Sequence, residues 1–158
     1  MSHGGELCEQ KGGNLNERQG IGGCFDKEFS HYSNLLFDVF LKNKYIPVIS
    51  STVLDELNNA PEYIKSHYKR LKNLIILEVD ANVLELANLY LKEKIISNNY
   101  LSDALHIALA TINKIDILVS WNFKHIVNLR KINLFNSVNI KEGYSILEIR
   151  SPMEVYYE

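Results

Sequence analysis

Apolar residues follow two patterns along the chain: some recur with the spacing of a helix, and others form short uninterrupted runs. Apolar positions three and four residues apart predict helices over residues 29–43, 61–72, 80–94 and 102–113, and a broken helix over 123–139. Short apolar runs between them predict strands over residues 46–50, 74–79, 117–120 and 145–149. Thr52, Asp80 and Ser102 are the expected caps of the helices that begin beside them.

Short apolar strands that alternate with helices are typical of a parallel sheet with both faces covered. The expected fold class is therefore α/β, with helices on either side of a mostly parallel sheet. In such folds ligands bind beyond the carboxyl ends of the strands. The residues that follow the strands at 46–50 and 117–120 are therefore the leading candidates for a binding or catalytic site.

The glycines divide the chain into two unequal parts. Seven of the eight glycines precede residue 24, and residues 1–20 show almost no apolar periodicity. Such a segment buries too little apolar surface to offset the entropy of ordering, so we expect residues 1–20 to be mobile or atypical. Residues 21–158 are expected to form one compact domain, because a chain of 158 residues can bury a single core.

Charge and cysteine content narrow the class of protein. The net charge of −2 gives no overall basic field, so charge alone does not predict non-specific binding of nucleic acid. Lysines and arginines cluster at 65–72 and at 124–131, where a solvated helix face is the simpler interpretation. Cys8 and Cys24 lack the spacing of a zinc site or a disulfide framework, and no apolar run reaches the roughly 18 residues of a membrane span. We expect a cytoplasmic protein with no membrane segment.

Three predicted elements carry oxygen-bearing side chains close to the ends of strands. Glu56 lies on the helix that follows the strand at 46–50, and Asn122 follows the strand at 117–120. Asp103 lies in the first turn of the helix at 102–113, where it also favours the helix dipole. Carboxylate and amide oxygens suit hard cations, so these residues are a candidate site for Mg²⁺ or Mn²⁺ that positions water for attack on a phosphate.

Three segments together resemble the PIN-domain family, and within it the VapC-like toxin ribonucleases: residues 48–57, 102–108 and 118–125. The resemblance implies a three-layer α/β/α sandwich over residues 21–158 and metal-dependent hydrolysis of RNA phosphodiesters. It also implies a homodimer and a cognate antitoxin protein as partner. Glu56 and Asp103 match two acidic metal ligands of the family, and Asn122 matches a further position that is often Asp.

The start of the chain departs from the family pattern. Family members begin with an apolar strand that ends in an acid, and counting back places Glu17 where that acid belongs, without the apolar strand residues. Two functions stay open: a toxin-type endoribonuclease, weakened by loss of the first acid, or a catalytically inactive PIN-like module that binds a protein or RNA. A different enzyme on a similar sheet has no support, because no glycine-rich phosphate loop or nucleophile elbow is present.

Three further residues near the candidate site have two interpretations each. Trp121 is a candidate for stacking on an RNA base, or an aromatic that covers the end of the strand. Lys124 is a candidate phosphate contact, or a solvated lysine. His106 follows Asp103 by three residues on nearly the same helix face. It is a candidate to reach a phosphate or an acid behind the site, or a packing histidine, which is the simpler interpretation.

Overall fold

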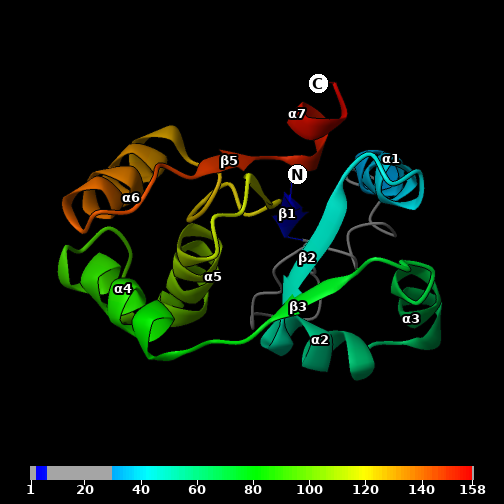
Figure 1. The fold of residues 1–158 in the computed structure, drawn as a ribbon, viewed down its shortest axis with the longest axis horizontal. Coiled ribbons are helices and arrows are strands. Elements are labelled where there is room, and N and C mark those ends of the chain that lie inside the picture. Colours follow the sequence, from blue (N-terminus) through cyan, green and yellow to red (C-terminus); the bar gives the residue numbers. More distant parts are fainter. Residues whose placement is uncertain (1–2, 7–29, 158) are drawn as a thin grey trace.

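The computed structural model describes residues 3–6 and 30–157, which form a mixed α/β fold (Figure 1). The strands are β1 His3–Glu6, β2 Ile46–Ser50, β3 Ile75–Leu77, β4 Ile117–Val119 and β5 Glu148–Arg150. The α-helices are α1 Ser30–Leu41, α2 Ser51–Asn58, α3 Glu62–Tyr68, α4 Ala81–Lys92, α5 Leu101–Ile112, α6 Leu129–Lys141 and α7 Pro152–Tyr156, and the 3₁₀ turn η2 Asn98–Tyr100 precedes α5. None of the described helices is both long and apolar enough to cross a bilayer.

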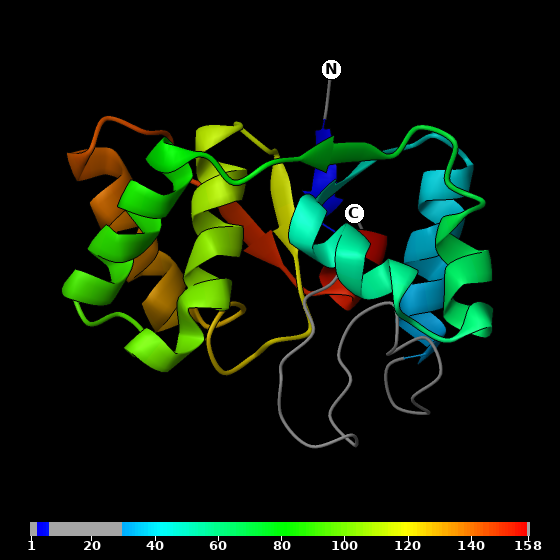
Figure 2. The same ribbon diagram turned by 90° about the horizontal axis from the view of Figure 1, so that it is seen from below.

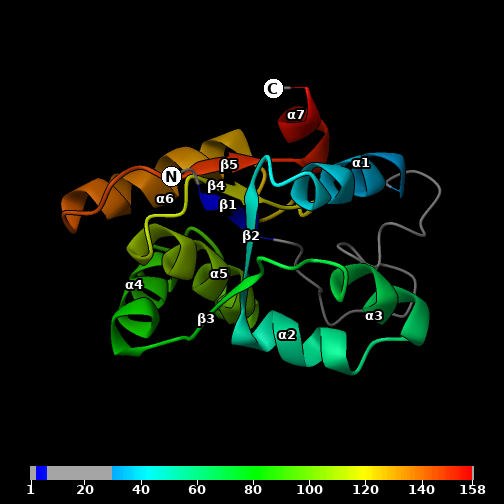
Figure 3. The same ribbon diagram turned by 45° about the vertical axis from the view of Figure 1, so that its right-hand side comes forward.

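All the paired strands run parallel, as the sequence pattern predicts. One sheet has the order β1-β2-β3, and β4 pairs with β5 in a second. Strand β1 also lies against β4, so it separates β2 from the β4-β5 pair (Figure 3). Parallel strands have their carboxyl ends at one edge, so the residues that follow β2 and β4 come to the same side of the molecule.

Successive residues of β2 and β4 belong to two different hydrophobic clusters. Val48 and Leu118 pack with side chains of α4, α5 and α6, whereas Ile49 and Val119 pack with side chains of α1, α2 and α3. This alternation follows from the pleat of a strand, which points neighbouring side chains to opposite faces. Both faces of these strands are therefore buried, which explains why the strand sequences are apolar throughout.

The predicted elements exist, but several of their ends differ from the prediction. Asp80 caps α4 as predicted, with its carboxylate accepting the N–H of Val83 at 2.9 Å. The predicted cap Thr52 is wrong: β2 runs directly into α2, and Ser50 at the strand end caps the helix instead. The predicted cap Ser102 is also wrong, because η2 leads into α5 at Leu101, so that Ser102 already lies inside the helix.

Besides the 3₁₀ turn η2, the described residues include a strand and a helix that the pattern did not predict, β1 and α7. Strand β1 falls in the glycine-rich start, and the remainder of that segment, with Cys8 and Cys24, lies outside the described residues. Helix α7 begins with a capping box, in which Ser151 and Glu154 each accept a hydrogen bond from the other's backbone N–H. That motif was legible in the sequence as a Ser followed three residues later by a Glu.

A buried polar cluster joins the helices that carry the site to the rest of the core. Asn139 of α6 is fully buried; its Oδ1 accepts from the hydroxyl of Tyr90 on α4, and its Nδ2 donates to Thr111 on α5 at 3.3 Å. These bonds tie α4, α5 and α6 together inside an apolar environment, where an unsatisfied polar group is costly.

We therefore expect Asn139→Ala to lower the free energy of unfolding by about 1–3 kcal/mol, because it leaves the Tyr90 hydroxyl without its acceptor. Asn133→Ala, on the exposed side of the same helix, is the matched control and should change little. Chemical denaturation of both variants checks this, and equal stability of the two would contradict it.

Candidate functional site

The candidate site lies where β2 and β4 end and α5 begins. The start of α5 and the loop that follows β4 lie at the same end of the molecule (Figure 2). Glu56 is carried to this region by α2, which continues β2 without a loop and is held by its Ser50 cap. The three candidate oxygen ligands thus come from three segments that are distant in sequence.

Asp103 and Asn122 are in direct contact. The Nδ2 of Asn122 donates to Oδ2 of Asp103 at 3.3 Å, and the two side chains are only 3% and 1% exposed, respectively. An ionised carboxylate is stable at such depth only when hydrogen bonds or charges compensate for lost water. Asn122 supplies one such compensating donor.

The orientation of the Asn122 amide is fixed by its own loop. Its Oδ1 accepts the backbone N–H of His125 at 3.0 Å, and its backbone N–H donates to Oγ of Ser120 at 3.0 Å. Because a backbone N–H can only donate, the oxygen of the amide must face His125, and the NH₂ group must face Asp103. Asn122 therefore holds and orients the carboxylate of Asp103, with its own oxygen turned into the loop.

Glu56 is half-buried, and its electrostatic neighbour is His106. Burial raises the pKa of the Glu56 carboxyl above 4.5, and His106 partly opposes this shift. Two adjacent acids would raise a pKa by mutual repulsion, but here the cause is loss of solvent. His106 is 6% exposed and lines a small cavity of about 30 Å³ with Ser50 and Ser102. His106 thus lies near enough to the acid Glu56 to affect its ionisation, in line with the interpretation that this histidine reaches an acid behind the site.

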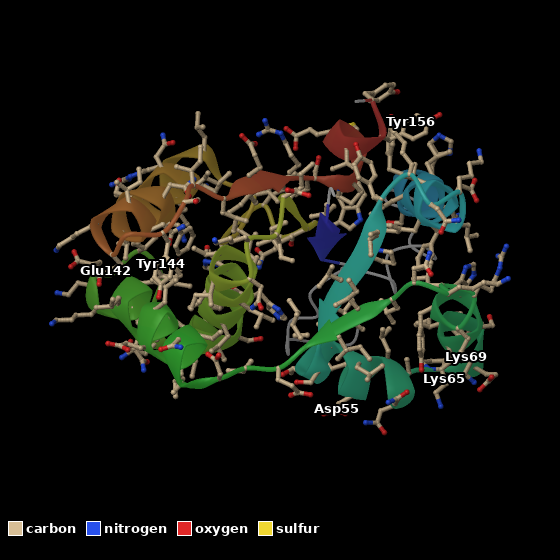
Figure 4. All side chains as sticks on the ribbon, in the orientation of Figure 1. Asp55, Lys65, Lys69, Glu142, Tyr144 and Tyr156 are labelled. Carbon is tan, nitrogen blue, oxygen red and sulfur yellow. The ribbon has the colours of Figure 1, made fainter. Side chains whose placement is uncertain are left out.

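The other predicted residues fall in different environments. Trp121 is 3% exposed and donates from its indole to Oγ of Ser33, so it covers the strand end as the simpler interpretation had it and presents no face for a base. Lys124 is exposed at the loop that follows β4. Glu17 lies outside the described residues, whereas β1 ends at Glu6, which places an acidic residue at the end of that strand. Asp55, next to Glu56, is exposed on the outer side of α2 (Figure 4).

Sequence reasoning missed a buried group beside Asn122. The ring of His125 is 4% exposed, lies 4.0 Å from the ring of Tyr100 and accepts from Nζ of Lys131 at 3.0 Å. It also missed Phe123, which is 46% exposed next to Lys124. No sequence spacing joins residues 100, 125 and 131, so only their positions in the folded chain could have identified the group.

The donor chemistry suits a hard divalent cation only in part. Two carboxylates, Glu56 and Asp103, offer the oxygen ligands that Mg²⁺ and Mn²⁺ favour. Within residues 3–6 and 30–157 no three His, Cys, Asp or Glu side chains converge on one point. No protein family model matches the sequence, and neither the curated proteins nor the solved structures contain a match to it.

The raised pKa of Glu56 predicts a stability effect in the metal-free protein. A folded-state pKa above 4.5 means that the ionised carboxylate destabilises the fold at neutral pH, and that protonation relieves this as the pH falls. We expect Glu56→Gln to raise the melting temperature at pH 7, and the gain to vanish below the ordinary pKa, where both states are protonated.

Glu85→Gln on the exposed face of α4 is the control for a change of charge alone. Thermal unfolding in EDTA over a series of pH values gives the measurement. A gain that is the same at every pH would exclude the ionisation of Glu56 as its cause.

Proposed function

We propose that this protein is a metal-dependent endoribonuclease of the toxin class found in toxin–antitoxin pairs. The observation that carries the proposal is the buried pair of Asp103 and Asn122 at the carboxyl edge of parallel strands, with the half-buried Glu56 on the adjoining helix. Buried carboxylates at that edge are costly for stability, and such costs are retained where they serve binding or catalysis.

The arrangement of the strands supports a PIN-type sandwich as the fold. Strand β1 lies between β2 and β4, all paired strands are parallel, and residues of β2 and β4 face two separate hydrophobic clusters. Helices on both sides of these parallel strands are what a three-layer α/β/α sandwich requires. We accordingly propose the PIN-domain architecture that residues 48–57, 102–108 and 118–125 resemble.

Each residue then has a role that follows from its contacts. Asp103 and Glu56 would hold Mg²⁺ or Mn²⁺, and the ion, when bound, supplies Lewis acidity and an activated water. Asn122 keeps the carboxylate of Asp103 in one orientation, and His106 favours the ionised form of Glu56. Phe123 and Lys124, exposed beside the site, would contact a base and a phosphate of the RNA.

A catalytically inactive PIN-like module is the second candidate. The observation in its favour is that, among the described residues, no three His, Cys, Asp or Glu side chains come together as a metal site would require. Magnesium depends on carboxylates for its affinity, so a site without a third acid binds the ion weakly. For the nuclease we propose a cognate antitoxin and a second copy of the chain as partners, and for the inactive module a protein partner or RNA. A cytoplasmic location stays a prediction.

RNA hydrolysis in Mn²⁺ or Mg²⁺ separates the two candidates. We expect slow cleavage by the chain as it stands, and a loss of about 100-fold or more for Asp103→Asn, because a metal-bound carboxylate contributes several kcal/mol to such reactions. Glu6→Gln and Glu17→Gln, compared side by side, identify which acid completes the site. Cleavage that survives Asp103→Asn would overturn the site, and no cleavage at all would favour the inactive module.

A second test measures the metal site without RNA. Asn122→Asp keeps the acceptor for the N–H of His125 but puts a carboxylate against Asp103, so it should destabilise the metal-free protein by like-charge repulsion. Mn²⁺ should then raise the melting temperature of this variant more than that of the natural chain. Asn128→Asp, a cap of α6 in the same loop, adds the same charge away from the site and is the control. Equal shifts for the two variants would contradict a cation at Asp103.

A further inference from the structure

A groove with a volume of about 840 Å³ lies between the end of α4 and the start of α5. Its apolar lining comes from Leu91, Ile96 and Leu101, and its polar lining includes Lys92, Lys94 and Asn98. The volume is within the range of about 300–1,000 Å³ that small-molecule sites occupy. None of these residues belongs to the site built around Asp103.

The lysines give the groove its charge. Both are exposed, one on the last turn of α4 and the other just beyond it. Among the residues that the structure describes, ion pairs join Lys69 to Glu62 and Arg150 to Glu148, and neither Lys92 nor Lys94 takes part in one. The two ammonium groups are thus available to an anionic ligand, although the whole chain is acidic.

The position of the groove relates it to the candidate site. Leu101, which lines the groove, is two residues before Asp103, and the connection from α4 to α5 lies at the same end of the molecule as the loop after β4 (Figure 2). The basic cluster at Lys65 and Lys69 projects instead from α3, on the opposite side of the molecule from α4 (Figure 4). The groove lysines therefore lie nearer to the start of α5 than that cluster does.

We propose that this groove binds single-stranded RNA next to the cleavage site. The proposal rests on the proposed function and adds where the RNA substrate binds outside the cleavage site. Lys92 and Lys94 bind phosphates, the Asn98 amide can hydrogen-bond to a base edge, and the apolar lining packs against sugars or bases. An acidic peptide is the competing occupant, but the proposed reaction at Asp103 acts on RNA and not on a peptide.

The chain provides a matched control for Lys94. Lys94 and Lys114 both follow a helix in the left-handed conformation, with φ of 55° and 52°. Each donates its N–H three residues back, to Leu91 and to Thr111, and each precedes a buried Ile. Lys114 lies at the far end of α5, about 18 Å from its start at 1.5 Å per residue.

Lys94→Gly and Lys114→Gly therefore remove the same charge and relieve the same backbone strain. The measurement is the fluorescence anisotropy of a labelled oligouridine, titrated with each full-length variant in EDTA. Lys94→Gly should weaken binding about fivefold at about 0.1 M salt, and should lower the slope of log K against log salt by about 0.7, as expected for one lost phosphate contact. Lys114→Gly should bind like the natural chain.

Cleavage assays keep this proposal separate from the proposed function. If the natural chain cleaves RNA, Lys94→Gly should raise KM and leave kcat unchanged. If the natural chain cleaves RNA but Lys94→Gly and Lys114→Gly bind RNA equally well, the groove is not the RNA site although the protein is a nuclease. Groove-dependent binding without any cleavage would support the groove and overturn the nuclease, and a chain that neither binds nor cleaves RNA would overturn both. Polyglutamate that displaces the labelled RNA as well as unlabelled RNA does would overturn RNA as the occupant.

Discussion

The hydrogen bond from Asn122 to Asp103 is the interaction on which the arrangement of the candidate site depends. It joins the first turn of α5 to the loop after β4, and it does so almost completely out of contact with solvent. A carboxylate in that position is costly unless donors surround it. The loop after β4 is accordingly built to present one donor, with Ser120 and His125 fixing the backbone and the amide of Asn122 in place.

The hydrophobic clusters on the two faces of the strands make this arrangement possible. Neighbouring residues of β2 and β4 pack into different clusters, so a slip of either strand by one residue would move each side chain into the cluster on the opposite face and disrupt the packing of both. The register of the strands therefore determines where their carboxyl ends lie. That in turn brings α2, α5 and the loop after β4 to one edge, and the buried Asn139 cluster holds α4, α5 and α6 in their relative positions.

In the two proposals, acidic and basic side chains have different roles: the acids bind a metal ion and the lysines bind RNA phosphates. The acids at the edge of the strands, Asp103 and Glu56, are buried or half-buried, where a divalent cation would compensate them. The groove lysines are exposed, and contacts from such lysines to a phosphate backbone weaken as salt is added. An acidic chain can in this way bind a polyanion locally without a basic surface overall.

The sequence by itself determined the type of nearly every element and the identity of Asp103 and Asn122 as residues at the ends of elements. Apolar periodicity and capping residues act over a few neighbouring positions, so they are legible in one dimension. Only the tertiary structure decided that α2 is capped by Ser50 and that α5 begins at Leu101. It also decided that His106 is the neighbour of Glu56, and what Trp121 and His125 contact. The physical reason is that burial and hydrogen-bond partners depend on segments that are far apart in the chain, and no local pattern records which of them will meet.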